Sequence, residues 1–317
     1  MVTGATGFVG RALVRRLLAE GRRVRAALRG ASAELPAEVE RAVVGDIGPE
    51  TDWSAAFDGV DTVAHLAARV HVLREDAADP LATFRAVNAE GTRRLAEAAR
   101  AASVRRVVYV STIGVHGVKT EGRPFDESSP FAPESLYAQS KLEGEKVLRE
   151  VLAGSRTEWT ILRPPLVYGP DAPGNFGRLV RLVARGVPLP LGAVRNRRSL
   201  IYVENLADAI VRCIDHLAAA NETFVVSDGA NLSTANLVRR IAEASGTPAR
   251  LLPCPPVLLR CAGAMLGRRG EVGRLIDDLA IDSARLRRRL DWTPPFTAHE
   301  GLTLSSRPAG RASGEGR

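Results

Sequence analysis

Short apolar runs alternate with longer amphipathic stretches through the first half of the chain. Turn residues separate the runs from stretches in which apolar positions recur three and four residues apart. The first pattern predicts strands and the second predicts helices. The predicted strands are 24–28, 43–46, 60–66, 106–111, 158–163 and 223–226, and the predicted helices are 11–20, 80–101, one that contains Tyr137, and 175–184. This alternation predicts an α/β fold with a Rossmann-type, doubly wound parallel sheet.

Proline and glycine become dense at 164–173 and 186–192, where the alternation ends. We therefore expect the chain to leave the sheet there and to build a smaller, mostly C-terminal substrate lobe. The predicted nucleotide-binding lobe is 1–169 with 200–228 returning to it, and the predicted substrate lobe is 170–199 with 229–304. The segment 305–317 is rich in Ser, Gly and Arg, which predicts a disordered tail.

A run of glycines near the first residue predicts a phosphate-binding turn. Gly4, Gly7 and Gly10 follow a GxxGxxG spacing and lead into the apolar helix at 11–20. Such glycines permit a tight turn, a close approach of backbone to a pyrophosphate, and packing of helix on strand. The predicted cofactor contacts here are Gly4, Thr6, Gly7, Phe8, Val9 and Gly10. A plain glycine turn is the alternative, because glycine triplets alone are weak evidence.

The strand before Gly4 is short. Only three residues precede that glycine, whereas a strand of this kind has about five. Unpaired buried backbone groups cost about 1–3 kcal/mol each, so we expect residues upstream of Met1 to complete the strand.

The end of the second strand bears on the choice of cofactor. An NAD site usually places Asp or Glu there to bind the ribose hydroxyls, but this chain has Arg29 and no acid. An arginine suits a 2′-phosphate, which favours NADP(H) over NAD(H), unless Arg29 is only a solvated surface charge. Asp46, which follows the third strand, is placed to accept a hydrogen bond from the adenine amino group.

Composition narrows the functional classes. The formal net charge is +8 with an isoelectric point near 10.1, but the arginines are scattered and no basic–aromatic interleaving indicates nucleic-acid binding. A modest attraction for anionic substrates remains. Three cysteines without CxxC spacing favour neither disulfides nor a metal site. With no apolar stretch long enough for a membrane span and no signal peptide, a cytoplasmic protein is expected.

Tyr137 and Lys141 carry the most specific chemistry. They lie four residues apart in a predicted helix, so both side chains share one face. A free phenol titrates near pH ~10, and a neighbouring ammonium lowers that value. Such a pair suits proton transfer near neutral pH, and together with a dinucleotide site it indicates carbonyl/alcohol redox chemistry. Thr112 ends an apolar strand at the ligand-binding edge of the sheet, where its hydroxyl can meet a substrate oxygen or cap a turn.

In this order, Gly4-x-x-Gly7-x-x-Gly10, Thr112 and Tyr137-x-x-x-Lys141 resemble the extended short-chain dehydrogenases/reductases. More narrowly, the chain resembles the NAD-dependent epimerase/dehydratase group that acts on nucleotide sugars. Supporting motifs are His65-Leu-Ala-Ala, Asn88-x-x-Gly91-Thr92, Arg163-Pro-Pro-Leu-Val-Tyr-Gly-Pro170 and the segment from Arg198 to Asp208.

The resemblance implies roles for individual residues. It implies that Tyr137 is the acid/base, that Lys141 lowers its pKa and binds the nicotinamide ribose, and that Thr112 steadies the substrate oxygen. Further implied cofactor contacts are Asp46, Ile47, Leu66, Ala67, Ala68, Asn88 and Pro164, and the implied substrate contacts are Asn175 and Arg198. The resemblance is also compatible with a homodimer.

Three positions depart from the common pattern of the group. Leu166, Ser199 and His116 stand where Asn, Asp and Tyr are frequent. The chain looks more like the reductases of UDP-4-keto-6-deoxy-N-acetylhexosamines, which serve surface polysaccharide synthesis. A UDP-sugar 4-epimerase with tightly bound NAD is the alternative within the group. A non-catalytic, redox-sensing Rossmann protein is the alternative from another class.

Overall fold

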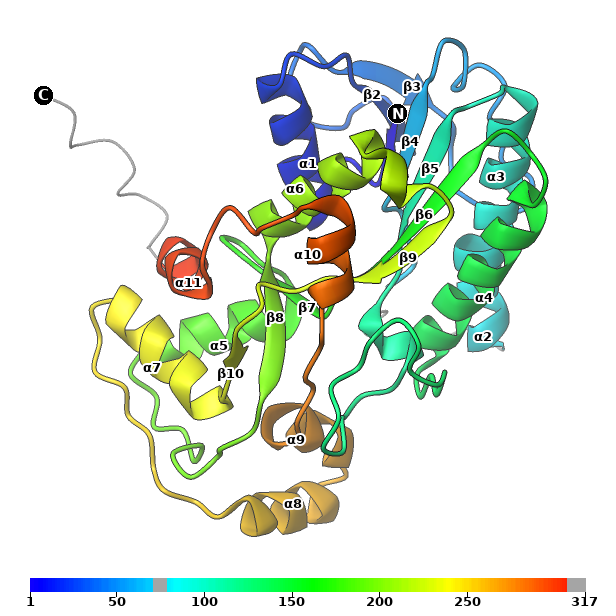
Figure 1. The fold of residues 1–317 in the computed structure, drawn as a ribbon. Coiled ribbons are helices and arrows are strands. Elements are labelled where there is room, and N and C mark those ends of the chain that lie inside the picture. The colour runs from blue at the N-terminus through cyan, green and yellow to red at the C-terminus, as the bar shows by residue number, and fades with distance from the viewer. Residues whose placement is uncertain (71–78, 307–317) are drawn as a thin grey trace, which may run out of the picture.

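The computed structural model describes residues 1–70 and 79–306, and it is built on a seven-stranded parallel sheet (Figure 1). The strand order is β3-β2-β1-β4-β5-β6-β9, which confirms the predicted doubly wound arrangement. In that order the strands are Glu40–Val43, Arg25–Leu28, Val2–Thr3, Thr62–His65, Arg106–Val110, Glu158–Arg163 and Glu222–Val225. β1 has two residues and still pairs with β2 on one side and β4 on the other.

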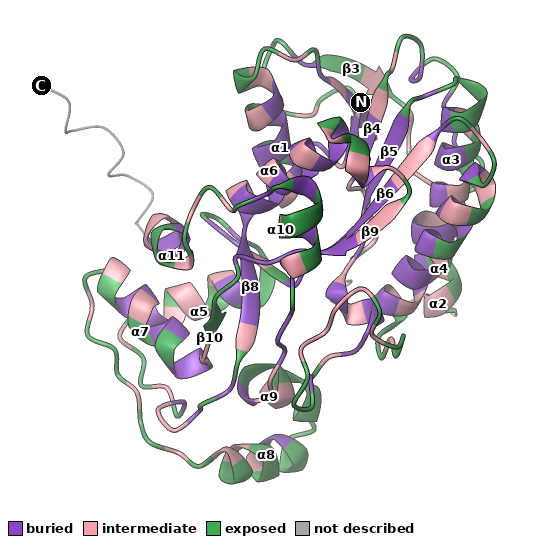
Figure 2. Cartoon of the chain, in the orientation of Figure 1, coloured by how far each residue is buried: buried purple, intermediate pink, exposed green. Residues whose placement is uncertain are grey.

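Helices cover both faces of this sheet. α1 and α6 pack against each other on one face, and α3 and α4 pack together on the other (Figure 1). The bounds are α1 Phe8–Ala19, α2 Pro80–Arg85, the π turn η1 Ala86–Glu90, α3 Gly91–Ala101, η2 Ile113–Val115, α4 Leu136–Leu152, α6 Val203–Asp215 and η3 Leu217–Ala219. β5 is almost fully buried between the two layers (Figure 2), as expected of a central parallel strand.

A second, three-stranded sheet organises the smaller lobe. Its order is β10-β8-β7, with β8 antiparallel to β10 and parallel to β7. Its elements and the surrounding helices are β7 Leu166–Tyr168, α5 Gly174–Ala184, β8 Arg198–Tyr202, β10 Asn231–Leu232, α7 Thr234–Ala244, α8 Pro256–Met265, α9 Arg269–Ile276, α10 Ala284–Leu290 and α11 Ala298–Ser306. One buried apolar cluster runs from α1 and α6 into α5 and α7, so the two lobes share a core.

The structure corrects four expectations from the sequence. The third strand is β3, Glu40–Val43, and not 43–46, because the chain turns at Gly45 with φ +74°. The helix expected at 80–101 is interrupted by the π turn η1. Residues 200–202 belong to the small sheet, so the chain rejoins the large lobe only with α6. Ser305 and Ser306 end α11 and are buried, and the rest of the expected tail lies outside the described residues.

Arg106 is a fully buried arginine at the beginning of β5. Its guanidinium donates to the carbonyl oxygens of Cys213 and His216 at 2.6 and 2.8 Å, beside the C-terminus of α6. It also forms an ion pair with Glu158 of β6 at 2.6 Å. A buried charge needs partners of this kind, and here they tie the middle of the sheet to the helix above it.

Asp228 links the two sheets. It follows β9, and its carboxylate accepts hydrogen bonds from the backbone N–H of Tyr202, the amide of Asn205 and the hydroxyl of Tyr168. Tyr168 and Tyr202 belong to the small sheet, and Asn205 to α6.

Within the described ranges, no helix combines the length and the apolar character needed to cross a membrane.

Candidate active site

The glycine turn forms a cradle that only glycine can line. Gly4 has φ +67°, and a Cβ there would lie 2.8 Å from the backbone nitrogen of Ala67. A Cβ on Gly10 would lie 2.0 Å from the carbonyl oxygen of Gly4. α1 begins after Gly7 without a side-chain cap and without an acid in its first turn, so its first N–H groups are left for an anion. This backbone fits the pyrophosphate of a dinucleotide.

The segment at 66–68 lies against this turn through Ala67. Ala67 donates its N–H to the Thr3 hydroxyl at 3.1 Å, and that hydroxyl also lies 2.7 Å from Nδ1 of His65. Nε2 of His65 lies 3.1 Å from the hydroxyl of Thr92 in α3. Burial, with a smaller contribution from the nearby charge of Lys141, lowers the pKa of His65 to about 3, so the ring is neutral. The His65 imidazole thus connects β1, through Thr3, with α3, through Thr92.

Asn88 lies in the π turn and ties this region to the helix that carries Tyr137. Its side chain exchanges two hydrogen bonds with the backbone of Arg69, at 2.8 and 2.9 Å, and donates to the Ser140 hydroxyl at 2.9 Å. Asn88 therefore holds backbone next to the site, while its contact with cofactor remains a prediction. Gly91, the first residue of α3 after this turn, sits close to Ile47, since a Cβ on Gly91 would lie 2.7 Å from that side chain. Insertions of this type often occur at functional sites.

Arg29 and Asp46 meet at the ends of β2 and β3. Their side chains form an ion pair at 2.6 Å, and both are more than four-fifths exposed. Among the described residues directly after β2, no acid stands at the place where an NAD site presents one. The pair lies where the adenosine ribose of a bound dinucleotide is expected, and its role in binding stays a prediction.

Tyr137 and Lys141 occupy adjacent turns of α4, whose N-cap is Ser135. Nζ of Lys141 lies 3.9 Å from the ring centroid of Tyr109, and within the described chain it has no hydrogen bond. Burial lowers the pKa of Lys141 to about 7, although the carboxylate of Glu145 opposes that shift. Burial also raises the pKa of Tyr137 to about 12. The expected lowering of the phenol pKa is therefore not seen, because burial disfavours the charged phenolate.

Thr112 caps the short helix η2, and its Oγ1 accepts a hydrogen bond from the N–H of Gly114 at 3.1 Å. This is the capping alternative, and it leaves the O–H of Thr112 free to donate. A Cβ on Gly114 would touch both Thr112 and Ala138, which places Thr112 beside the first turn of α4. The carbonyl of Pro164 accepts from Ile113 at 2.9 Å and so lies next to Thr112.

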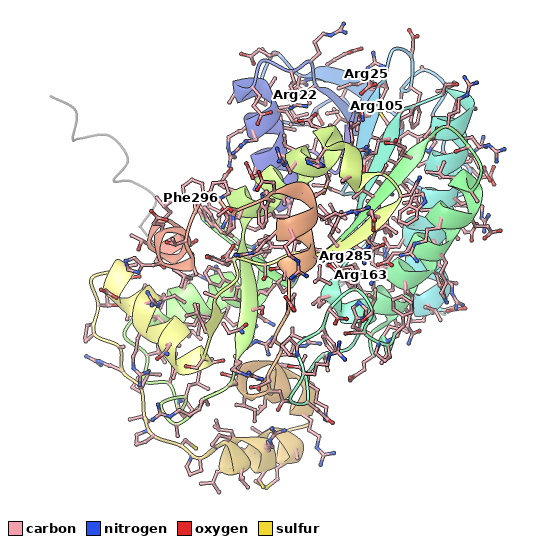
Figure 3. The ribbon with its side chains drawn as sticks, viewed as in Figure 1. Arg22, Arg25, Arg105, Arg163, Arg285 and Phe296 are labelled. Atoms are coloured by element: carbon pink, nitrogen blue, oxygen red, sulfur yellow. The ribbon has the colours of Figure 1, made fainter. Side chains whose placement is uncertain are left out.

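A buried ionic network lies behind α4, the helix that contains Tyr137, and it was not expected from the sequence. Glu145, two turns after Tyr137, accepts from Ser111 at 2.5 Å and from two nitrogens of Arg163 at 2.9 and 2.5 Å. Nη1 of Arg163, labelled in Figure 3, donates to Nε2 of His116 at 2.9 Å, and Nδ1 of His116 lies 3.2 Å from the Pro130 carbonyl. The spacing from Lys141 to Glu145 was the signal available in the sequence. The network fixes α4 against β5 and β6.

Arg198 begins β8 in the smaller lobe. Its Nη1 donates to the carbonyl oxygen of Asp277 at 3.0 Å, and burial lowers its pKa. Asn175 is exposed in the first turn of α5. Both residues thus lie in elements of, or next to, the three-stranded sheet, and their contacts with substrate remain predictions.

Comparison with known proteins identifies the family of the chain. Residues 1–227 match the family model described as "NAD dependent epimerase/dehydratase family". The chain belongs to this family. It is 41% identical to a UDP-glucose 4-epimerase of Vibrio cholerae, over 95% of this chain and 92% of that protein. It is 32% identical to a UDP-glucose 4-epimerase of Mycolicibacterium smegmatis, with 95% of each chain covered.

A solved epimerase/dehydratase structure has the same fold. The UDP-glucose 4-epimerase of Thermus thermophilus, solved with NAD, superposes with a TM-score of 0.75 at 27% identity and 96% coverage of each chain. Membership of the epimerase/dehydratase family identifies the chain as an enzyme that uses a nicotinamide cofactor, and it sets aside the non-catalytic sensor.

Proposed function

We propose that this enzyme reduces the 4-keto group of a UDP-4-keto-6-deoxy-N-acetylhexosamine and takes its hydride from NADPH or NADH. The observation that best supports the proposal is that Thr112, just after β5, lies beside the first turn of α4, the helix that contains Tyr137 and Lys141. Open parallel sheets bind their ligands at this edge. In vivo, the product would serve the synthesis of surface polysaccharide.

The residues divide the work as follows. When bound, the nicotinamide supplies hydride to the carbonyl carbon. With its pKa raised to about 12, Tyr137 keeps its proton at neutral pH and is prepared to donate it from Oη to the developing alkoxide. The free O–H of Thr112 steadies that oxygen. A cationic Lys141 then stabilises the phenolate left on Tyr137, and Arg198 meets the substrate diphosphate.

Exchange of cofactor in each cycle separates a reductase from an epimerase. A reductase must release its oxidised cofactor, whereas an epimerase keeps its cofactor while the keto-sugar turns over. The exposed Arg29–Asp46 pair and the missing acid after β2 support an adenosine end that is loosely held and accepts a 2′-phosphate. They favour the reductase.

The test combines bound cofactor with turnover. We expect purified enzyme to carry little stoichiometric NAD(H) and to oxidise NADPH when a UDP-4-keto-6-deoxy-N-acetylhexosamine is added. Tyr137→Phe should reduce turnover about 10²–10⁴-fold while NADPH still binds, since it removes only the acid. Turnover near the wild-type rate in that variant would overturn the proposed chemistry.

The similarity to UDP-glucose 4-epimerases favours a second candidate, a UDP-sugar 4-epimerase. One tightly held NAD per chain, with interconversion of UDP-glucose and UDP-galactose and no net NADPH oxidation, would establish that activity in place of the reductase.

A further inference from the structure

The helix α8 carries an apolar face that the rest of the described chain leaves uncovered. Val257, Leu258, Cys261 and Met265 lie on one side of this helix, and Met265 is 82% exposed. The opposite side packs inward through Leu259 and Gly263, where a Cβ would lie 2.6 Å from a methyl group of Val272 in α9. Because α8 is anchored by that side, the exposed face is part of the folded structure. We call Val257, Leu258, Cys261 and Met265 the α8 face.

The α8 face stands at the outer end of the smaller lobe. α8 and α9 lie at the lower extremity in Figure 1, and α8 is largely exposed in Figure 2. Leu252 and Leu266, before and after the face, are also exposed. Contiguous exposed apolar surface of this kind marks a binding site more often than isolated exposed residues do.

Arginines flank α8 along the chain. Between residues 250 and 278 there are five arginines against one glutamate and two aspartates, an excess of positive charge in a chain whose formal net charge is +8. Arg268, Arg269 and Arg274 are exposed, and their guanidinium groups have no hydrogen bond or ion pair to the described residues. Arg260 pairs with Asp277 at 2.6 Å. The surface next to the apolar face is therefore basic and available.

We propose that the α8 face docks on an anionic phospholipid membrane, with α8 lying in the plane of the interface. A short helix with an apolar side and flanking arginines has the chemistry of an interfacial segment. Arginines at a membrane surface gain from the negative potential of acidic lipids. A second copy of this chain fits less well, because facing copies would bring the same unpaired arginines together.

Binding to lipid vesicles tests the proposal. The intact enzyme should float with vesicles that contain phosphatidylglycerol and should bind vesicles of pure phosphatidylcholine at least about tenfold more weakly. Leu258→Glu combined with Met265→Glu should reduce binding to the acidic vesicles at least about tenfold, because carboxylates would enter the apolar interface. Reversal of the charge by Arg268→Glu should also weaken binding, and it should make the remaining binding less sensitive to added salt, because fewer charges are left to be screened.

Two matched controls keep the test specific. Leu217 is 84% exposed in η3, outside the α8 face, and Leu217→Glu should bind vesicles like the wild type. Arg23 lies after α1, and Arg23→Glu makes the same charge change away from the face. Equal binding to acidic and neutral vesicles, or equal losses in the controls, would overturn the proposal. A dimer that the Leu258/Met265 variant converts to monomer, without vesicle binding by the wild type, would assign the face to self-association instead.

Discussion

Arg29 directly follows β2, and we propose that it meets the 2′-phosphate by which NADPH differs from NADH. Arg29→Ala should weaken NADPH binding about tenfold, since a charge-assisted bond to the 2′-phosphate is lost, and should leave NADH binding nearly unchanged. Arg23→Ala, which removes a charge before β2, is the control. Titrations of both cofactors by fluorescence measure the change. An equal loss for both cofactors would show that Arg29 acts only as a surface charge.

His65 makes stability depend on pH. Its pKa falls from the usual 6.5 to about 3 in the folded protein because the ring is buried. Between those values the unfolded chain binds more protons, so the free energy of unfolding decreases as pH falls through this window. We expect His65→Gln to show a shallower decrease from about pH 6.5 to 4 in urea unfolding experiments. A wild-type slope in His65→Gln would contradict the assignment.

At the scale of elements, the contact between α4 and the π turn depends on a residue without a side chain. A Cβ on Gly144 would lie 2.3 Å from the carbonyl oxygen of Asn88 and 2.4 Å from Oη of Tyr109. Gly144→Ala should therefore push the two elements apart and lower the free energy of unfolding by about 1–3 kcal/mol. Urea denaturation measures the loss.

The control is a helical glycine with free space around it. Gly270, in α9, has no atom within 4 Å of an added Cβ, so Gly270→Ala should be neutral or stabilising. A gain of about 0.4–1 kcal/mol is typical where the backbone already suits alanine. Equal stability of the two variants would show that α4 can move away from the π turn at no cost.

Elements with strong local signals were predictable from the sequence. The strand expected at 158–163 is β6, because an apolar run bounded by turn residues defines it. The small sheet escaped prediction, since β7 and β10 have three and two residues and are too short for periodicity to appear. The π turn was not predicted for another reason. It inserts one residue into the helix and leaves the apolar pattern on either side intact.

The residues of the candidate site also fall into some that the sequence predicted and some that it did not. Tyr137 and Lys141 were recognisable because they are four residues apart on one helix. The partners of Glu145 were not, because Arg163 follows it by 18 residues on another element and His116 precedes Arg163 by 47. The direction of the Tyr137 pKa shift could not be predicted from the sequence either, because it depends on how far tertiary packing excludes water.

At the scale of the whole molecule, the two lobes are joined by Asp228. Asp228→Asn replaces an acceptor for three donors with an amide, and leaves buried groups without full partners. We expect a loss of about 1–3 kcal/mol or more in the free energy of unfolding, measured in urea by tryptophan fluorescence. Tyr168→Phe removes one of those donors and should cost less. A larger loss in Tyr168→Phe than in Asp228→Asn would assign the effect to packing of the phenol ring.

The partners of Arg106 bear on how the chain folds during synthesis. Its guanidinium is paired with Glu158 of β6 and with carbonyl oxygens of Cys213 and His216 at the end of α6. These carbonyls are synthesised more than a hundred residues after Arg106. Domains generally fold as units as they emerge. A nascent chain that stops at residue 169 lacks α6, so the guanidinium of Arg106 would have no carbonyl partner there, and we expect β5 to pack fully only after α6 has been made. The large sheet is thus completed late, when the first elements of the smaller lobe have already been synthesised.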